Sequence, residues 1–198
     1  MTEEIEVSAQ ETVTPKKKTR EVKSEQSEDS VSERMALGIF ALNEKAVIPS
    51  FATDGSACFD LSACFEIGDK IDCIIQEQKS FRRASDNGIA IHAGERFLIP
   101  TGLIFDIPEG YCLEIYPRSG ISFKQGLTLS NCTAIIDSDY VEQTFISIHN
   151  MSGSSRYIQA GDRIGQAKLV KLVTTKINVL SSKPGQKTKR KGGFGSTG

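Results

Sequence analysis

RFLIPTGLIFDI, residues Arg96 to Ile107, is the stretch that decides the fold class of this chain. It is short, rich in β-branched and aromatic residues, and interrupted by Pro100, a pattern typical of strands and not of a long helix. Similar stretches recur at short intervals, and they predict an all-β sandwich, jelly roll or barrel with little helix, about one turn after Ser119. They are YCLEIYP (111–117), GLTLSN (126–131), QTFISIHN (143–150) and RIGQAKLVKLV (163–173).

The size and composition of the chain fit one globular domain. With 198 residues, of which 38% are hydrophobic and 25% charged, it can bury one good-sized core but not two. We place this β domain at residues 35–182. Within it, segment 68–88 mixes an apolar cluster with a polar second half, and we interpret it as a surface insertion that forms a hairpin or a short helix.

The first 34 residues predict a disordered arm. They carry nine acidic and six basic side chains and almost no large apolar ones, so they cannot bury enough surface to offset the entropy of ordering. The basic cluster from Lys16 to Arg20 is compatible with a nuclear-import or nucleic-acid signal, but short basic runs are common in solvated tails, and we prefer that interpretation. We expect no nucleic-acid partner.

Several function classes are excluded at this stage. No apolar run approaches the length of a membrane-spanning helix, and no secretory leader follows the basic cluster. The five cysteines include no CxxC pair, which fits neither a disulfide framework nor a zinc site. We therefore expect a cytoplasmic protein without a membrane partner, in the cytoplasm of an infected host cell if the source is viral.

The C-terminal end has the composition of an anion-binding lid. No acidic residue follows Asp162, whereas nine Lys and Arg residues lie between Arg163 and Lys191. The chain then ends in GGFGSTG (192–198), whose glycines can bring many backbone N–H groups close to one ligand. This is not a Walker loop, because GxxxxGK[ST] is absent. We interpret residues 183–198 as a flexible lid.

The stretch AIIDSDY (134–140) carries the most chemistry. It runs from an apolar pair into Asp137 and Asp139, which share one face if the segment is a strand of a hairpin, and a buried carboxylate is costly unless it is used. YPRSGIS (116–122) adds a guanidinium and a hydroxyl, and RIGQ (163–166) adds polar groups on a later strand. A carboxylate base, cationic donors and a Gly-rich lid together indicate hydrolysis of a phosphate anhydride.

These segments resemble the five ordered motifs of the trimeric dUTPase family. The resemblance runs from about Ile39 to Gly198 and leaves out the arm and segment 68–88. It implies a jelly-roll-like β subunit that assembles as a homotrimer with shared active sites. The implied reaction is hydrolysis of dUTP to dUMP and pyrophosphate, with Mg²⁺ on the triphosphate. The motifs are ATDGSACFDL (52–61), PRSG (117–120), AIIDSDY (134–140), RIGQ (163–166) and GGFGSTG (192–198).

The resemblance also implies a role for individual residues. Asp137 matches the carboxylate that deprotonates the attacking water, and Tyr140 matches the ring beneath the deoxyribose that leaves no room for a 2′-hydroxyl. Asn131 and the backbone of Ile135 and Ile136 match the segment that reads the uracil edge. Asp60 matches a position that binds the water shell of the metal. The other substrate-binding positions are Arg118, Ser119, Gly120, Phe145, Gln166, Lys189, Arg190, Phe194, Gly195 and Ser196.

Three departures from the family pattern affect local geometry. Lys189 and Arg190 stand where the fifth motif usually has Arg and Gly, and Lys lacks the bidentate fork of Arg. Glu142 and Cys58 stand where the third and first motifs usually have Gly. These positions leave open how the tail closes and how the local backbone runs.

Two other functions stay open. The first is deamination of dCTP, since the dCTP deaminases resemble this fold, but they carry a catalytic Glu where this chain has Ser147, and they lack the Asp139–Tyr140 pair. The second is a dUTPase-like scaffold with a binding or regulatory role, acting on a further partner through residues 1–34 or 68–88. Hydrolysis of dUTP is the preferred interpretation.

Overall fold

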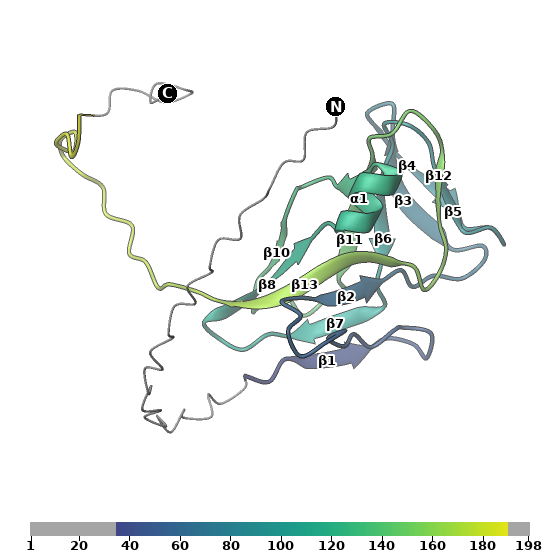
Figure 1. Cartoon of the computed structure of the whole chain (residues 1–198), viewed down its shortest axis with the longest axis horizontal. Coiled ribbons are helices and arrows are strands. Elements are labelled where there is room, and N and C mark those ends of the chain that lie inside the picture. Colours follow the sequence, from purple (N-terminus) through teal and green to yellow (C-terminus); the bar gives the residue numbers. More distant parts are fainter. Residues whose placement is uncertain (1–34, 190–198) are drawn as a thin grey trace, which may run out of the picture. The chain divides into compact units, whose positions relative to one another are not determined.

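The computed structural model describes residues 35–189, which form thirteen β-strands and one short α-helix (Figure 1). The all-β prediction is confirmed. In chain order the elements are β1 (Gly38–Ala41), β2 (Phe59–Ser62), β3 (Lys70–Ile75), β4 (Gln78–Arg83), β5 (Ile89–Ile91), β6 (Arg96–Pro100), β7 (Leu103–Asp106), β8 (Tyr111–Tyr116), α1 (Ser119–Gln125), β9 (Leu127–Leu129), β10 (Ala134–Ile136), β11 (Phe145–Asn150), β12 (Arg156–Ile158) and β13 (Arg163–Lys171).

Two larger antiparallel sheets carry the fold. One has five strands in the order β4-β3-β6-β11-β9, and the other has four in the order β10-β8-β13-β2. Two smaller ladders, β1 with β7 and β12 with β5, lie beside them. Strands that are neighbours in a sheet are mostly distant in sequence, so the sheets are connected by chain crossovers and not by a simple meander.

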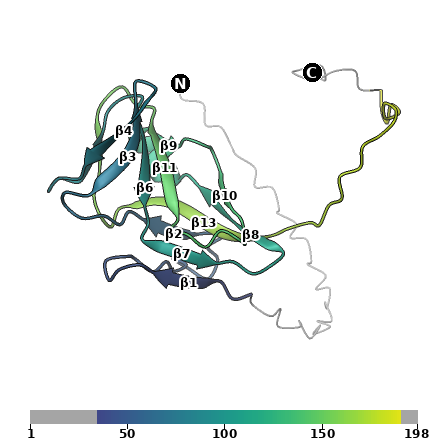
Figure 2. The same cartoon turned by 180° about the vertical axis from the view of Figure 1, so that it is seen from behind.

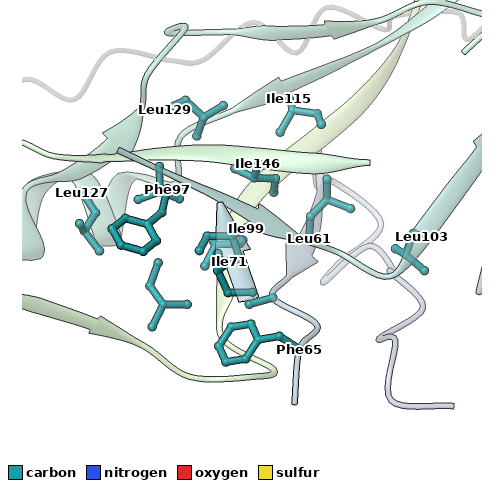
Figure 3. Packing of buried hydrophobic residues seen from close by; sticks show 14 of the residues in the cluster. Leu61, Phe65, Ile71, Phe97, Ile99, Leu103, Ile115, Leu127, Leu129 and Ile146 are labelled. Atoms are coloured by element: carbon teal, nitrogen blue, oxygen red, sulfur yellow. The ribbon is translucent and has the colours of Figure 1, made fainter. Parts of the chain in front are cut away.

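The core lies between the sheets because alternate residues of each strand are apolar and point inward. Phe97 and Ile99 of β6 and Ile146 of β11 come from the five-stranded sheet, and Leu61 of β2 and Ile115 of β8 come from the four-stranded one. Figure 3 shows these side chains packed together. All five are buried, so the two sheets are held in place by one continuous apolar cluster.

Segment 68–88 forms the expected hairpin, but the hairpin is not confined to the surface. A tight turn with positive φ at Gln76 and Glu77 joins β3 to β4. Strand β3 pairs with β6, and its Ile71 and Cys73 belong to the buried core. The hairpin is therefore part of the five-stranded sheet. Reading its polar second half as solvent-exposed was right for most of β4, but the apolar half packs inward.

A partly buried ion pair fixes this hairpin to the rest of the domain. Arg82 of β4 donates two hydrogen bonds to the Glu95 carboxylate, at 2.7 and 2.8 Å, and Glu95 also accepts one from the backbone N–H of His92. Burial raises the pKa of Glu95, but these hydrogen bonds outweigh it, so the pKa lies below its usual value. The carboxylate stays charged and keeps Arg82 in place.

The chain leaves the sheets after β13. The last backbone hydrogen bond that ties it to them runs from Leu172 N to Gly110 O, and residues 172–189 then continue away from the strands, as Figures 1 and 2 show from opposite sides. Among the described residues, no helix combines the length and the hydropathy that crossing a membrane would take.

Candidate functional site

One face of the four-stranded sheet collects polar side chains from three strands. Cross-strand partners in an antiparallel pair point to the same side, and Gln166 of β13 is the partner of both Asp60 of β2 and Tyr116 of β8. Their neighbours Ala167 and Ile115 are buried in the core, so Gln166, Asp60 and Tyr116 lie on the outer face. Residues of the first and fourth motifs thereby become neighbours.

Arg118 joins this face from the segment between β8 and α1. Its backbone is extended (φ −86°, ψ 134°) at the N-cap of the helix. Its Nε donates to Asp60 Oδ1 at 2.7 Å and its Nη2 donates to Asp60 Oδ2 at 3.2 Å, the bidentate geometry of a strong arginine–carboxylate pair. Within its own chain, the Arg118 side chain thus contacts Asp60 of the first motif.

Arg163 of the RIGQ motif completes the group, although it was not among the expected substrate-binding positions. Its Nη1 donates to Asp60 Oδ2 at 3.0 Å. In a regular strand Arg163 and Gln166 would point to opposite faces, because they are three residues apart. A register shift at the start of β13 instead makes Arg163 the partner of Ser62, which lies on the same side of β2 as Asp60. Side-chain alternation gives no signal for such a bulge.

Ser119 and Gly120 begin α1 and are exposed next to Arg118. A Cβ atom on Gly120 would meet no other atom within 4 Å, so packing within the chain does not require glycine there. Gln166 donates from Nε2 to the carbonyl of Pro117 at 2.9 Å, which ties β13 to the segment that carries Arg118. All four second- and fourth-motif residues expected at the phosphates are thus in one place.

Two small pockets share this group in their walls. One, of about 270 Å³, is lined by Asp60, Gln166 and Cys58 together with residues of the 50–57 segment. The other, of about 200 Å³, is lined by Arg118 and Arg163 together with Asp162, Gln125, Tyr157 and apolar residues. Sites that enclose a drug-sized ligand are typically larger, about 300–1,000 Å³. Neither of these two pockets is therefore large enough by itself to enclose a nucleotide.

The third motif differs from its predicted conformation. Strand β10 ends at Ile136, and a hydrogen bond from Tyr140 N to Asp137 O closes a turn directly after it. The prediction that Asp137 and Asp139 share one face of a strand is therefore wrong, and both side chains are exposed in the turn. The expected hairpin is also absent from this segment, because β10 pairs with β8, whereas β9 pairs with β11.

The remaining third-motif residues surround this turn. Ile135 is 61% exposed, and the Tyr140 hydroxyl donates to the carbonyl of Gln143 at 2.9 Å, which fixes one end of its ring. Asn131 is exposed in the loop between β9 and β10. These side chains form a second group of expected site residues, at the β10 edge of the sheet.

The two groups lie far apart within one chain. Ile136, the last residue of β10, lies opposite Leu113 of β8, and Arg118 follows Leu113 by five residues. At about 3.3 Å per residue, the acidic turn after Ile136 and Arg118 are roughly 16 Å apart along the sheet. A catalytic base has to reach its target directly or through one water, so the acidic turn cannot serve the Arg118 group of its own chain.

The six remaining expected residues are Phe145, Lys189 and four residues of the tail. Phe145 begins β11 in the other sheet, opposite Pro100, and is partly exposed. Lys189 is exposed in the irregular segment after β13. The tail residues Arg190, Phe194, Gly195 and Ser196 lie outside the described residues.

A polar group that the sequence had not indicated lies between the two edges. Tyr116 donates a hydrogen bond to Glu114, and Lys168 of the neighbouring strand places its ammonium 5.2 Å from the centre of the Tyr116 ring. The hydrogen bond with Glu114 raises the pKa of Tyr116, and the hydrogen bond with Tyr116 raises that of Lys168. Glu114, Tyr116 and Lys168 thus interact with one another, and Lys168 stays charged.

Comparison with known sequences relates the chain to one family. The model of the dUTPase family matches residues 83–198. The deoxyuridine 5'-triphosphate nucleotidohydrolase of Brucella melitensis is 36% identical over 151 residues, covering 76% of this chain and 84% of the relative. The enzyme of the same name from Hydrogenobaculum sp. is 34% identical over 165 residues, covering 83% of this chain and 99% of the relative.

Solved structures show the same fold. The dUTPase of Staphylococcus bacteriophage 80alpha, solved with dUPNHPP, has a TM-score of 0.64 and 21% identity, covering 82% of this chain and 98% of its own. The dUTPase of Streptococcus mutans has a TM-score of 0.55 and 22% identity, covering 72% and 99% of the respective chains. These similarities confirm the jelly-roll-like β fold.

Proposed function

Since the chain belongs to the dUTPase family and is a dUTP diphosphatase, we propose that it cleaves dUTP by attack of an Asp137-activated water on the α-phosphorus. The products are dUMP and pyrophosphate, so the reaction lowers dUTP and supplies the precursor of dTMP. The observation that carries this assignment is the exposed carboxylate of Asp137 at the end of β10. Among the residues of 35–189 it has no ion-pair partner, so it is available to accept a proton from water.

We propose that the uracil binds along β10. This strand is at the edge of its sheet, so one side of its backbone lacks a ladder partner within the described residues and can offer N–H and C=O groups to a base. Asn131, Ile135 and Ile136 line this edge, and the fixed ring of Tyr140 is proposed to pack under the deoxyribose. A 2′-hydroxyl would collide with that ring, which would exclude UTP.

The phosphates are proposed to bind Arg118, Ser119, Gly120 and Gln166. The free space at Gly120 supports this, because it lets phosphate oxygens approach the backbone closely. The partly exposed Phe145 and the tail residues Lys189, Arg190, Phe194, Gly195 and Ser196 remain proposed substrate contacts.

The dUTPase family uses a divalent metal, and we propose that it is Mg²⁺ carried by the triphosphate. The protein offers little to hold the ion on its own, because residues 35–189 contain no cluster of three or more His, Cys, Asp or Glu. Mg²⁺ commonly binds through substrate phosphates and keeps several waters. Bound there, it would neutralise charge on the phosphates. The expected metal contact, Asp60, has three of its roughly four acceptor positions taken by arginines, so it could accept one hydrogen bond from a metal-bound water.

We propose a homotrimer in which each site uses more than one chain. This is supported by the roughly 16 Å between the acidic turn and Arg118 within one chain, and by the apolar segment after β13. Val173, Ile177 and Val179 are 84, 93 and 96% exposed, and each would gain about 1.5–3 kcal/mol from full burial. A neighbouring copy would cover them and receive the lid. The five free thiols suit the proposed cytoplasmic location, and a further partner of residues 1–34 or 68–88 stays a prediction.

Charges in this apolar segment should dissociate the assembly. In the double variant Ile177→Asp, Val179→Asp, the molar mass measured by light scattering is expected to fall from three chains to one, and turnover should fall with it. The matched control is Thr175→Asp, Asn178→Asp, which introduces the same charges at exposed polar positions of the same segment. A double variant that stays trimeric would contradict the role of the segment.

A substrate panel tests the proposed function. Pyrophosphate release with Mg²⁺ should be faster for dUTP than for UTP, dTTP or dCTP by on the order of 10²-fold or more. UTP and dTTP carry an added hydroxyl or methyl group that should not fit, and cytosine presents a reversed donor and acceptor pattern to the groups that read uracil. Ammonia is measured with dCTP in parallel. Ammonia release from dCTP, or no turnover of dUTP, would overturn the assignment.

A further inference from the structure

Asp60 holds two guanidinium groups at once. Its Oδ1 accepts from Arg118 Nε, and its Oδ2 accepts from both Arg118 Nη2 and Arg163 Nη1. The two arginines also contact each other directly, because Arg118 Nη1 donates to the backbone carbonyl of Arg163 at 3.2 Å. One carboxylate thus brings together cations from two separate segments of the chain.

The bulge at the start of β13 allows Arg163 to reach Asp60. Without the register shift, Arg163 would lie opposite Ala63, whose side chain is in the core. With the shift, Arg163 lies on the outer face within reach of Asp60. Its side chain is 60% exposed, whereas those of Arg118 and Asp60 are mostly shielded. The exposed guanidinium therefore has donors left over that face solvent.

The group keeps an excess of positive charge. Two guanidinium cations and one carboxylate leave a net charge of one, and Asp60 occupies only part of the five N–H donors of each arginine. Two planar guanidinium groups with unused N–H donors are suited to bind phosphate oxygens. The second pocket, of about 200 Å³, opens on Arg118 and Arg163 and also on the Asp162 carboxylate, so an anion would enter from the side of the two arginines.

We propose that Asp60 is a positioning residue that holds Arg118 and Arg163 as one phosphate-binding unit, and that Arg163 is a second arginine in contact with the substrate phosphates. This inference rests on the proposed binding of the triphosphate beside Arg118. It assigns Asp60 a task that does not involve the metal: three of the roughly four acceptor positions of its carboxylate are taken by the two arginines.

The test is the binding of the non-hydrolysable analogue α,β-imido-dUTP, measured by calorimetry in EDTA and in Mg²⁺. Arg163→Gln should weaken binding about tenfold in both conditions, since it removes a charge-assisted contact that needs no metal. In an Asp60→Asn background the same Arg163→Gln change should cost less than about twofold, because the arginine is no longer held in place. Lys171→Gln, with the same charge change on the same strand, is the control.

Turnover adds a second readout that a merely structural role would not produce. The Mg²⁺ concentration for half-maximal turnover should be unchanged in Asp60→Asn, whereas a role in the metal's water shell would raise it severalfold. A raised Mg²⁺ requirement, or an Arg163→Gln protein that binds the analogue in EDTA as tightly as the parent, overturns the inference. The second outcome applies even if Asp60→Asn fails to fold, since Arg163 is exposed. Absence of analogue binding by the parent chain would instead refute the proposed function.

Discussion

Replacing Asp137 with Asn is expected to lower kcat by about two to four orders of magnitude, the usual contribution of a general base. Asparagine has nearly the same shape but cannot accept a proton from water. Because Asp137 lies in an exposed turn after β10 and has no ion-pair partner among the described residues, the substitution should not disturb the fold. The measurement is single-turnover hydrolysis of dUTP together with the Kd of α,β-imido-dUTP.

The control for this prediction lies two residues away. Asp139→Asn removes the same charge from the same exposed turn, so it reports the purely electrostatic effect of a lost carboxylate. We expect it to reduce kcat by less than about tenfold, and the Kd of the analogue should stay within a few-fold in both variants. Near-normal turnover in Asp137→Asn, or equal losses in the two variants, would reject Asp137 as the base.

Deleting residues 192–198 is expected to reduce kcat/KM by on the order of 10²-fold or more, without dissociating the trimer. The deleted segment carries Phe194, Gly195 and Ser196, which are proposed to cover the uracil ring and the γ-phosphate of the substrate. Without them the triphosphate would be poorly oriented and open to water. The segment proposed to hold the copies together, around Ile177 and Val179, remains present in this variant.

Two measurements separate loss of the lid from loss of assembly. Light scattering should give the same molar mass for the truncated and the full chain. A second variant keeps the length of the chain but replaces residues 192–198 with serines, and it should be as impaired as the deletion if Phe194 and the glycines matter. Full activity of either variant would refute the lid, and a fall in mass would show that the tail acts through assembly.

The sequence was most informative where one residue's chemistry or a regular alternation decides the outcome. The composition of RFLIPTGLIFDI predicted strands, and β6 and β7 lie within this stretch. The apolar half of segment 68–88 was placed at the surface because its strand partner, β6, lies further along the chain. Burial of Ile71 and Cys73 depends on that pairing, and local composition carries no signal for it.

The candidate site shows the same division. Asp60, Arg118 and Gln166 were found from motif resemblance, and the sheet register brings them together. Arg163 was missed because its orientation depends on a one-residue bulge. The prediction that Asp137 and Asp139 share one face of a strand was wrong. Strand β10 ends at Ile136, and a turn closed by the hydrogen bond from Tyr140 N to Asp137 O follows it.

The sequence by itself determined the all-β class, the family and the chemical groups of the site, because strand alternation and motif chemistry are local properties. Only the tertiary structure decided which of those groups meet. It paired Arg118 and Arg163 on Asp60 and left Asp137 at the opposite edge of the sheet, because strand order and register join residues that are far apart in the chain. The carboxylate proposed as base and the arginines proposed for the phosphates are thus separated in one chain by geometry that no local pattern contains.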